Sequence, residues 1–483
     1  MASNGNIADV VYSLTGKGTS LEPIIDKFQA VALRLAKLDN ANIINSFYDA
    51  LRSYDASVTE PALDEMLTEE GLDVNVEGVD QNLLIKAFNA VATEKWVSLV
   101  NSYKGSVRPT AFMASLGTLY DEEKADSVYG IMHNPNFIES VNSLDDEVAS
   151  EVFDTLVYSV EMGTYSSLIV DTAQAASKYS GETAKEVARH IIYIGEDGHI
   201  DRAKYIANIF KRDDVVSSIN SLGSSAHNVA RELIHLNTAF DATKYLLTAA
   251  IALGKYEPEV AEYFVNRLND AAMWASTGYE ENFVRAVDGL GMEEFTEAIT
   301  KHKGRAKLFA TKEIFDAFYS ESLEAGKNTA QILGQDNIVN LVNLYEGSEE
   351  SIFETLRRLR ISHNIITDFP DLISSITMFH ERISSLPREI QQYLISAVAS
   401  ETISYNPDKA TQLISLMGLP GVISTMDKYK DKSELAKKVA FELVYTAKRY
   451  GTESSVARSA LRLQNPMWAE ILDTPNLDKF WSN

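Results

Sequence analysis

The histidines are the first residues to weigh for chemistry, because the chain has only eight of them and no cysteine. His227 and His235 lie eight residues apart, about two helical turns, and Glu232 stands three residues before His235. A Glu-x-x-His pair on a helix is half of a di-iron carboxylate site, in which facing helices each supply such a pair. The other such pair, Glu196 and His199, flanks an Asp-Gly turn, where helical spacing no longer holds. His227, Glu232 and His235 are therefore candidate metal ligands, and the alternative is a histidine bonded to a carbonyl between packed helices.

Other catalytic and cofactor motifs are missing from the sequence. Without cysteine, the chain has no thiolate nucleophile, no disulfide and no Cys-ligated zinc or iron–sulfur cluster. The segment around Lys17 resembles a phosphate loop, but Val11 stands where that loop needs its first glycine. No dinucleotide-binding glycine pattern, nucleophile elbow or zinc-protease helix occurs. The sequence thus predicts no cofactor and favours a non-catalytic chain. An all-helical enzyme or cofactor-binding protein, with a site built from residues distant in sequence, remains the alternative.

Charge is unevenly distributed along the chain, whose 44 basic and 69 acidic residues give a formal net charge of -25. Residues 1–350 contain 28 basic and 54 acidic side chains, whereas residues 351–483 contain 16 and 15. Because such an excess of carboxylates repels polyanions, binding to nucleic acid or an anionic membrane is disfavoured for the first 350 residues. Two basic clusters beyond them form a candidate contact surface: Arg357, Arg358, Arg360, Lys428, Lys430, Lys432, Lys437 and Lys438. Their convergence on one groove would support a further alternative, nucleic-acid packaging.

The elements that must position these residues are predicted to be helices. Most of the chain carries apolar residues at i, i+3, i+4 and i+7, the pattern of helices that bury one stripe. The best examples are Ile24–Leu38, Ala184–Ile194, Val229–Leu236, Val260–Leu268, Ile352–Leu359 and Leu435–Arg449. Tryptophans and tyrosines lie mostly in such stripes, so we expect them in the core first and in interfaces second. Leu72–Val79 alternates, and Ile191–Ile200 predicts a small hairpin about Asp197 and Gly198. The predicted fold class is all-α.

An eight-residue pattern, here called the octet, recurs along the chain and is the main sign of its organisation. It has two apolar residues, two variable ones, an apolar one, a usually polar one, a variable one and a closing apolar or aromatic residue. The copies are Trp96–Tyr103, Phe137–Leu144, Val215–Leu222, Phe283–Leu290, Ile338–Tyr345, Leu372–Phe379 and Val422–Tyr429. Most sixth positions are Asn or Asp, whose side chains bond nearby backbone at helix ends. The spacing of the copies indicates a unit of about 34–50 residues.

These patterns predict an irregular α-solenoid, in which helical hairpins that cannot bury their apolar stripes alone stack on their neighbours. The unit length is similar to that of HEAT and armadillo repeats, although no family consensus matches. The alternative is a large irregular multi-helical domain. We expect three regions: an N-terminal helical region at 1–80, an acidic helical-repeat region at 81–350 and a charge-neutral C-terminal helical region at 351–483.

The function that the sequence favours is protein interaction or structural assembly. An acidic helical-repeat surface would contact a protein partner or copies of the same chain, so the chain is expected to be a scaffold or a homo-oligomer. The first residues, MASNGNIADVVYSL, carry neither the basic segment nor the apolar run of a secretory signal. The longest apolar run, Leu246–Leu253, is far shorter than a membrane-spanning helix. We therefore expect a cytoplasmic protein with no membrane contact.

Overall fold

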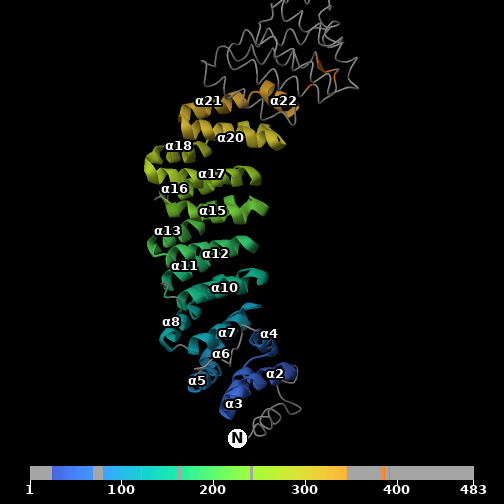
Figure 1. Ribbon diagram of the computed structural model, residues 1–483, viewed down its shortest axis with the longest axis vertical. Coiled ribbons are helices and arrows are strands. Elements are labelled where there is room, and N and C mark those ends of the chain that lie inside the picture. The colour runs from blue at the N-terminus through green and yellow to red at the C-terminus, as the bar shows by residue number, and fades with distance from the viewer. Residues whose placement is uncertain are drawn as a thin grey trace, which may run out of the picture. The chain divides into compact units, whose positions relative to one another are not determined.

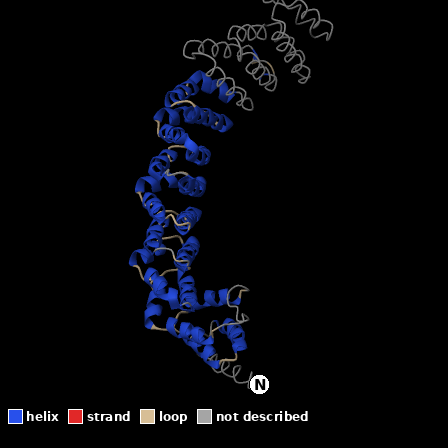
Figure 2. Ribbon diagram, turned by 60° about the vertical axis from the view of Figure 1, so that its left-hand side comes forward, coloured by secondary structure: helices blue, strands red, loops and turns tan. Residues whose placement is uncertain are grey.

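The computed structural model describes residues 24–68, 80–120, 122–161, 163, 166–239 and 243–344, with Ile383, Ser384, Leu386 and Gln391 beyond them. In this described part every regular element is a helix and no strand occurs (Figures 1 and 2), which confirms the all-α prediction. The chain divides into two compact units, Met1–Gly278 and Tyr279–Asn483, and each is treated by itself. The expected boundaries near residues 80 and 350 stay predictions.

The helices of unit 1 include four of the predicted segments. They are α2 (Ile25–Leu35), η2 (Ala36–Leu38), α3 (Ala41–Arg52), α4 (Ala56–Leu67), α5 (Gln81–Val91), α6 (Glu94–Asn101), α7 (Val107–Tyr120), α8 (Glu122–Met132), α9 (Pro135–Asn142), α10 (Asp146–Glu161), α11 (Ser166–Ala176), α12 (Gly181–Glu196), α13 (Ile200–Phe210), α14 (Asp213–Asn220), η3 (Gly223–Ser225), α15 (Ala226–Ala239), α16 (Thr243–Leu253) and α17 (Pro258–Trp274). The predicted helices at 24–38, 184–194, 229–236 and 260–268 are thereby confirmed. Those at 352–359 and 435–449 lie outside the described residues.

A π-helical turn, η4 (Ala275–Tyr279), occupies the boundary of the two units, and Gly278 within it has a φ of 109°. The helices of unit 2 are α18 (Glu280–Leu290), α19 (Glu293–Lys301), α20 (Gly304–Ser320), α21 (Leu323–Leu333) and α22 (Asp336–Leu344). Helix α20 packs on both α18 and α21, and α19 packs on α21. The Phe318 ring of α20 is buried between two glycines, Gly289 of α18 and Gly326 of α21, where added methyl groups would lie 2.9 and 2.4 Å from the ring.

Helix α10 shows how the sequence builds one element. Acidic residues Asp146 and Glu147 open it, where they interact favourably with the positive end of the helix dipole. Its apolar side chains recur at helical spacing and are buried: Val148, Val152, Phe153, Leu156, Val157 and Val160. The Phe153 ring meets the Tyr103 ring edge-on at a centroid distance of 5.1 Å. Full burial of each large apolar side chain contributes about 1.5–3 kcal/mol, so packing of this stripe, rather than helix propensity, holds α10 in place.

Helix α9 begins at a turn that the sequence marks clearly. Asn134 is the N-cap residue, and its side-chain oxygen accepts hydrogen bonds from the backbone N–H groups of Asn136 (3.0 Å) and Phe137 (3.4 Å). Pro135 takes the first helical position, where its missing N–H costs nothing. The Asn-Pro pair therefore fixes where the short helix starts, and Phe137 becomes its first buried residue.

Two sets of helices lie side by side in unit 1 (Figures 1 and 2). The long-helix layer comprises α7, α10, α12, α15 and α17, and each of these helices packs on the next. In the short-helix layer, α9 packs on α11, α11 on α13, and α13 on α16. Contacts of α11 and α13 with α12 join the two layers. The core lies between them, so each long helix has one buried flank and one flank on the surface.

One kind of hydrogen bond recurs where a helix has just ended. A buried Tyr or His side chain there donates to the carbonyl of the last residue of a later helix, 29 to 37 residues along the chain. This satisfies a carbonyl that has no partner within its own helix. The bonds are Tyr54 to Val91 (2.7 Å), Tyr103 to Met132 (2.7 Å), Tyr179 to Phe210 (3.0 Å) and His302 to Leu333 (2.9 Å).

A second recurring bond uses the polar sixth residue of the octet. Asn142 donates to the carbonyl of Ser102 (2.9 Å) and accepts from the backbone N–H of Lys104 (2.9 Å). In unit 2, Asn343 makes the same pair of bonds, with the carbonyl of Lys301 (3.2 Å) and the N–H of Lys303 (3.0 Å). Asn220 makes a longer one, to the carbonyl of Lys178 (3.5 Å). These asparagines thus bond backbone some forty residues away. The sequence pattern had suggested bonds to nearby backbone instead.

The octets fall on helices of different kinds. Those at 96–103, 137–144, 215–222 and 338–345 coincide with the short helices α6, α9, α14 and α22, as far as the described residues extend. The octet at 283–290 lies on α18. The helix that ends at the carbonyl bound by Asn343 is α19, however, and α19 carries no octet. The copies at 372–379 and 422–429 lie outside the described residues, as does the alternating segment at 72–79.

The predicted hairpin at 191–200 is wrong. Helix α12 continues to Glu196, a turn follows at Asp197 and Gly198, and α13 starts at Ile200. Gly195 allows the end of α12 to pack closely on α11, because a methyl group at residue 195 would lie 2.4 Å from a methyl carbon of Leu168 on α11. The chain turns back at Gly198, whose φ of 87° is in the left-handed region that favours glycine. The isoleucines before it are buried as a helical stripe, not as an alternating strand.

Candidate functional site

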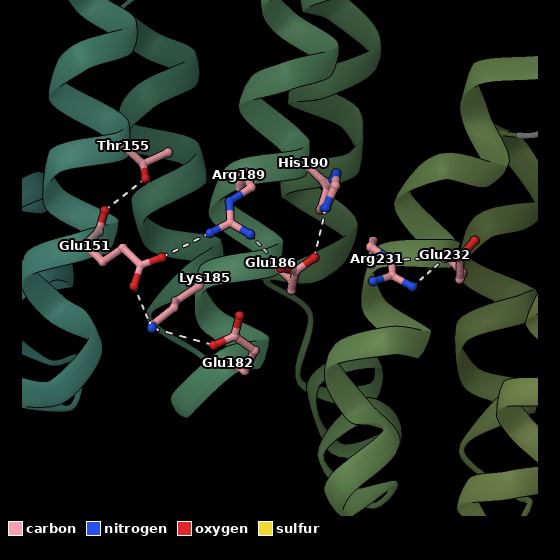
Figure 3. Close-up of polar contacts among 9 residues, drawn as sticks. All are labelled: Glu151, Thr155, Glu182, Lys185, Glu186, Arg189, His190, Arg231 and Glu232. Atoms are coloured by element: carbon pink, nitrogen blue, oxygen red, sulfur yellow. Dashed lines mark hydrogen bonds and ion pairs between the residues drawn. The ribbon is translucent and has the colours of Figure 1, made fainter.

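The polar side chains of the long-helix layer form the most connected charged cluster (Figure 3). On the α10 side, the Glu151 carboxylate lies 2.5 Å from Lys185 Nζ and 3.0 Å from Arg189 Nη2, both on α12. Lys185 also reaches Glu182 (3.6 Å), and Arg189 reaches Glu186 (2.8 Å). Its hydrogen bond to Glu151 raises the pKa of the Lys185 ammonium above its usual range. Glu151 therefore holds α10 and α12 in one register.

Between α12 and α15 the contacts involve two histidines. His190 Nε2 lies 2.9 Å from the carboxylate of Glu186, and the ring of His190 meets the ring of His235 edge-on, with centroids 4.6 Å apart. Burial lowers the pKa of His235, and the charge of His190 lowers it further. His190 and His235 are both the tenth residue of their helices, so this contact joins equivalent positions of α12 and α15.

Helix α15 contacts α17 through carboxylates. Glu232 accepts from Arg231 (3.0 Å) and from the side-chain amide of Asn269 (2.7 Å), which also donates to the Glu232 carbonyl (3.1 Å). Closer to the start of both helices, Glu262 accepts from Ser225 (3.1 Å) and Asn228 (3.2 Å). These bonds continue the register from α15 to α17. The partners are 34–37 residues apart in sequence.

The metal candidates His227, Glu232 and His235 all lie on α15, as the sequence implies. Glu232 accepts hydrogen bonds from Arg231 and Asn269, and the ring of His235 packs on the ring of His190. Over the described part of the chain, no group of three or more His, Asp or Glu side chains is arranged to hold a metal ion. The basic candidates Arg357, Arg358, Arg360, Lys428, Lys430, Lys432, Lys437 and Lys438 lie outside the described residues.

Sequence reasoning missed a set of exposed aromatic side chains on the long helices. Tyr158 of α10, Tyr193 of α12 and Trp274 of α17 are exposed to 59%, 56% and 59%. The expectation that tryptophans and tyrosines lie in the core holds for Trp96 and Tyr103 but is wrong for these three. A signal was present, because Tyr158 shares a helix face with Glu147, Glu151 and Asp154 rather than with the buried valines of α10.

The described helices are all too short or too polar to cross a lipid bilayer. Comparisons of the chain with protein-family models, with curated proteins and with solved structures find no match.

Proposed function

We propose that this protein is a non-catalytic interaction or assembly protein, built as an α-solenoid, whose acidic helical surface contacts a protein partner or further copies of the chain. The architectural part of the proposal rests on contacts between helices that are close in sequence order. Long helices pack on the next long helix and short helices on the next short one. Such nearest-neighbour packing is typical of solenoids, whose units bury their apolar flanks against adjacent units.

The recurring hydrogen bonds support the same architecture. Tyr54, Tyr103, Tyr179 and His302 make equivalent bonds to helix ends, and Asn142 and Asn343 make equivalent pairs of bonds to preceding turns. Equivalent contacts at spacings near 30 and 40 residues are expected when one structural unit recurs with sequence drift. They are not expected in an irregular multi-helical domain, the alternative that the sequence left open.

The observation that carries the functional part is the surface flank of α10, α12, α15 and α17. The four helices are held in register by Glu151, by the His190–His235 contact and by Asn269. Among their described residues, the exposed carboxylates are Asp146, Glu147, Glu151, Asp154, Glu182, Glu196, Glu259 and Asp270, whereas Arg189 is exposed and Lys185, Arg231 and Arg267 are partly buried. A flank this acidic, which also exposes large aromatic rings, suits protein recognition better than solvation alone.

Sedimentation velocity of the purified chain, and of the chain isolated from cells that express it, tests the proposal. We expect either concentration-dependent oligomers or a stoichiometric protein complex. Reversing two exposed charges of the flank, Glu147→Lys with Glu259→Lys, should weaken that association. The matched control reverses Asp201 and Glu139, exposed carboxylates of the short-helix layer. A chain that stays monomeric and partner-free, or equal effects of both double variants, would refute the proposal.

The solenoid is tested separately by small-angle X-ray scattering. A compact globule of this length has a radius of gyration of about 23 Å. An open stack of helical units must exceed that value clearly, and a measured value near it would favour the irregular domain. Polynucleotide binding at low salt would instead support the packaging alternative, because electrostatic binding to nucleic acid is strongest there.

A further inference from the structure

Three exposed aromatic side chains lie in the last turn of a long helix. Tyr158 and Tyr193 each stand three residues before the last residue of their helix, and Trp274 is the last residue of α17. More than half of each residue is exposed. Large aromatic rings in water forgo the burial that normally stabilises them, and they are enriched at protein interfaces.

The contacts across the layer put these three residues along one edge. Glu151 bridges to Lys185 and Arg189, and His190 meets His235, so residues at similar positions along neighbouring long helices are in contact. Along α15 and α17 the contacts follow in the same order, Asn228 with Glu262 and then Glu232 with Asn269, so these two helices run in the same direction. Tyr158, Tyr193 and Trp274 therefore form a line across α10, α12 and α17, here called the aromatic row. Helix α15 lies between the second and third members.

Each member of the aromatic row has an exposed carboxylate one helical turn away. Asp154 stands four residues before Tyr158, Glu196 three after Tyr193, and Asp270 four before Trp274. Side chains at these spacings share a helix face. Asp270 already pairs through Oδ2 with Arg267 (3.2 Å). A ring face beside a carboxylate provides cation–π attraction and an ion pair for the same cation, and the C-terminal end of a helix also favours positive charge.

The first of these carboxylates lies in a concentrated negative region. Although Asp154 is exposed as a residue, partial burial of its carboxylate raises its pKa above the usual range. Burial also raises the pKa of Glu65 on α4, and the negative charge of Asp154 raises it further. Because the negative charge of Asp154 opposes the ionisation of Glu65, a cationic group placed beside them would stabilise their charged forms. The complementary ligand is therefore positively charged, which excludes nucleic acid and anionic lipid.

We propose that the aromatic row and its three carboxylates bind an extended protein segment that carries lysine or arginine side chains. This inference rests on the proposed function and specifies its partner. Packed helices lie about 8–10 Å apart, and a segment in the extended polyproline II conformation advances about 3.1 Å per residue and returns a side chain to the same face every third residue. Three residues thus span α10 to α12, and about six span α12 to α17. The segment should carry basic residues at positions i, i+3 and i+9, or at i, i+6 and i+9 in the opposite direction.

Fluorescence anisotropy with synthetic peptides tests the inference on the full chain. The probes are labelled Gly-Ser peptides with three arginines at each of these two spacings, and a third probe has the same composition with adjacent arginines. We expect saturable binding of one spaced probe, weaker binding of the adjacent one and loss of affinity with added salt. The variant that removes all three rings, Tyr158→Ala with Tyr193→Ala and Trp274→Ala, should lose about tenfold or more in affinity.

The matched control is Tyr205→Ala, which removes an exposed tyrosine of α13, in the short-helix layer. It should leave the affinity unchanged within about twofold, and circular dichroism should show both variants folded, because exposed side chains contribute little to stability. The inference is wrong if no spaced probe binds saturably, if the triple variant keeps its affinity or if Tyr205→Ala loses as much. Should that happen while Glu147→Lys with Glu259→Lys still disrupts a complex or oligomer, the proposed function stands without this partner.

Discussion

A single methyl group at Gly254 should separate the short helices α14 and α16. Gly254 follows the end of α16 and lies against Ser218 of α14, and a methyl group there would be 2.4 Å from the Ser218 Cβ and 2.6 Å from its Cα. Carbon atoms in contact stay about 3.5–4.0 Å apart. Because one of the two atoms belongs to the backbone, no side-chain rotation relieves the contact, and α14 must move away from α16 by about 1 Å. The Ser221 hydroxyl bond to the Gly254 carbonyl (3.3 Å) would be lost with it.

The expected size of this effect follows from two opposing contributions. Forcing an extra methyl group into a packed contact costs about 1–3 kcal/mol. Alanine restricts the unfolded chain more than glycine does, which returns about 0.4–1 kcal/mol. We expect Gly254→Ala to lower the free energy of unfolding by about 1–2 kcal/mol. Gly117→Ala is the matched control in the same unit, because Gly117 lies inside α7 with nothing within 4 Å of the added methyl group. It should raise stability by about 0.5–1 kcal/mol.

Urea unfolding measures the difference between the two variants, and amide hydrogen exchange shows where it arises. Exchange should accelerate in α14 and α16 for Gly254→Ala, with α7 unchanged. If Gly254→Ala proves as stable as Gly117→Ala, or if α14 and α16 keep their protection, then α14 and α16 do not approach as closely as the structure has them.

Three further predictions concern other contacts. Gly326→Ala should destabilise unit 2 by about 1–3 kcal/mol, because the methyl group meets the buried Phe318 ring at 2.4 Å, and Phe318→Leu in the same chain should restore part of the loss in thermal unfolding. Tyr103→Phe removes the hydroxyl that donates to the Met132 carbonyl, so the urea midpoint should fall by the equivalent of about 1–2 kcal/mol; an unchanged midpoint would mean that water satisfies the carbonyl. Burial lowers the pKa of His302, so the unfolded chain binds the proton more readily; stability is full above the unfolded pKa of about 6.5 and declines as the pH falls below it, and His302→Gln should flatten that dependence in urea titrations at successive pH values.

Helix positions were predictable because they depend on local periodicity. The segment 184–194 carries its apolar residues at helical spacing, and α12 contains all of it. The hairpin predicted at 191–200 was wrong. Ile191, Ile192 and Ile194 fit a short alternating pattern nearly as well as they fit a helical stripe. What decided between the two was Leu168, a residue more than twenty positions earlier that packs on Gly195. A contact of that kind has no signature within the segment itself.

The candidate site was predictable only where its residues lie on one helix. Glu232 and His235 were placed correctly on a common helix, yet Asn269 and His190, which bind and pack on them, are 37 and 45 residues away. No spacing rule links such residues, because the link depends on how one helix pair stacks on the next. Tyr158 was a different kind of omission: it stands off the apolar stripe of α10, and its position among carboxylates already indicated exposure.

The asparagines of the octet connect these two observations. The sequence suggested that they cap their own helix ends, whereas Asn142 and Asn343 each join both a carbonyl and an N–H of a turn 38 to 42 residues earlier. A pair of bonds from one amide side chain fixes position along the helix as well as distance, which apolar packing alone does not do. Because Asn142 ends α9 just before α10 begins, its bonds to the turn before α7 also set where α10 starts relative to α7. The register of the long helices depends on polar contacts between neighbouring helices as much as on the apolar core. The alignment of their exposed aromatic side chains therefore depends on those contacts too.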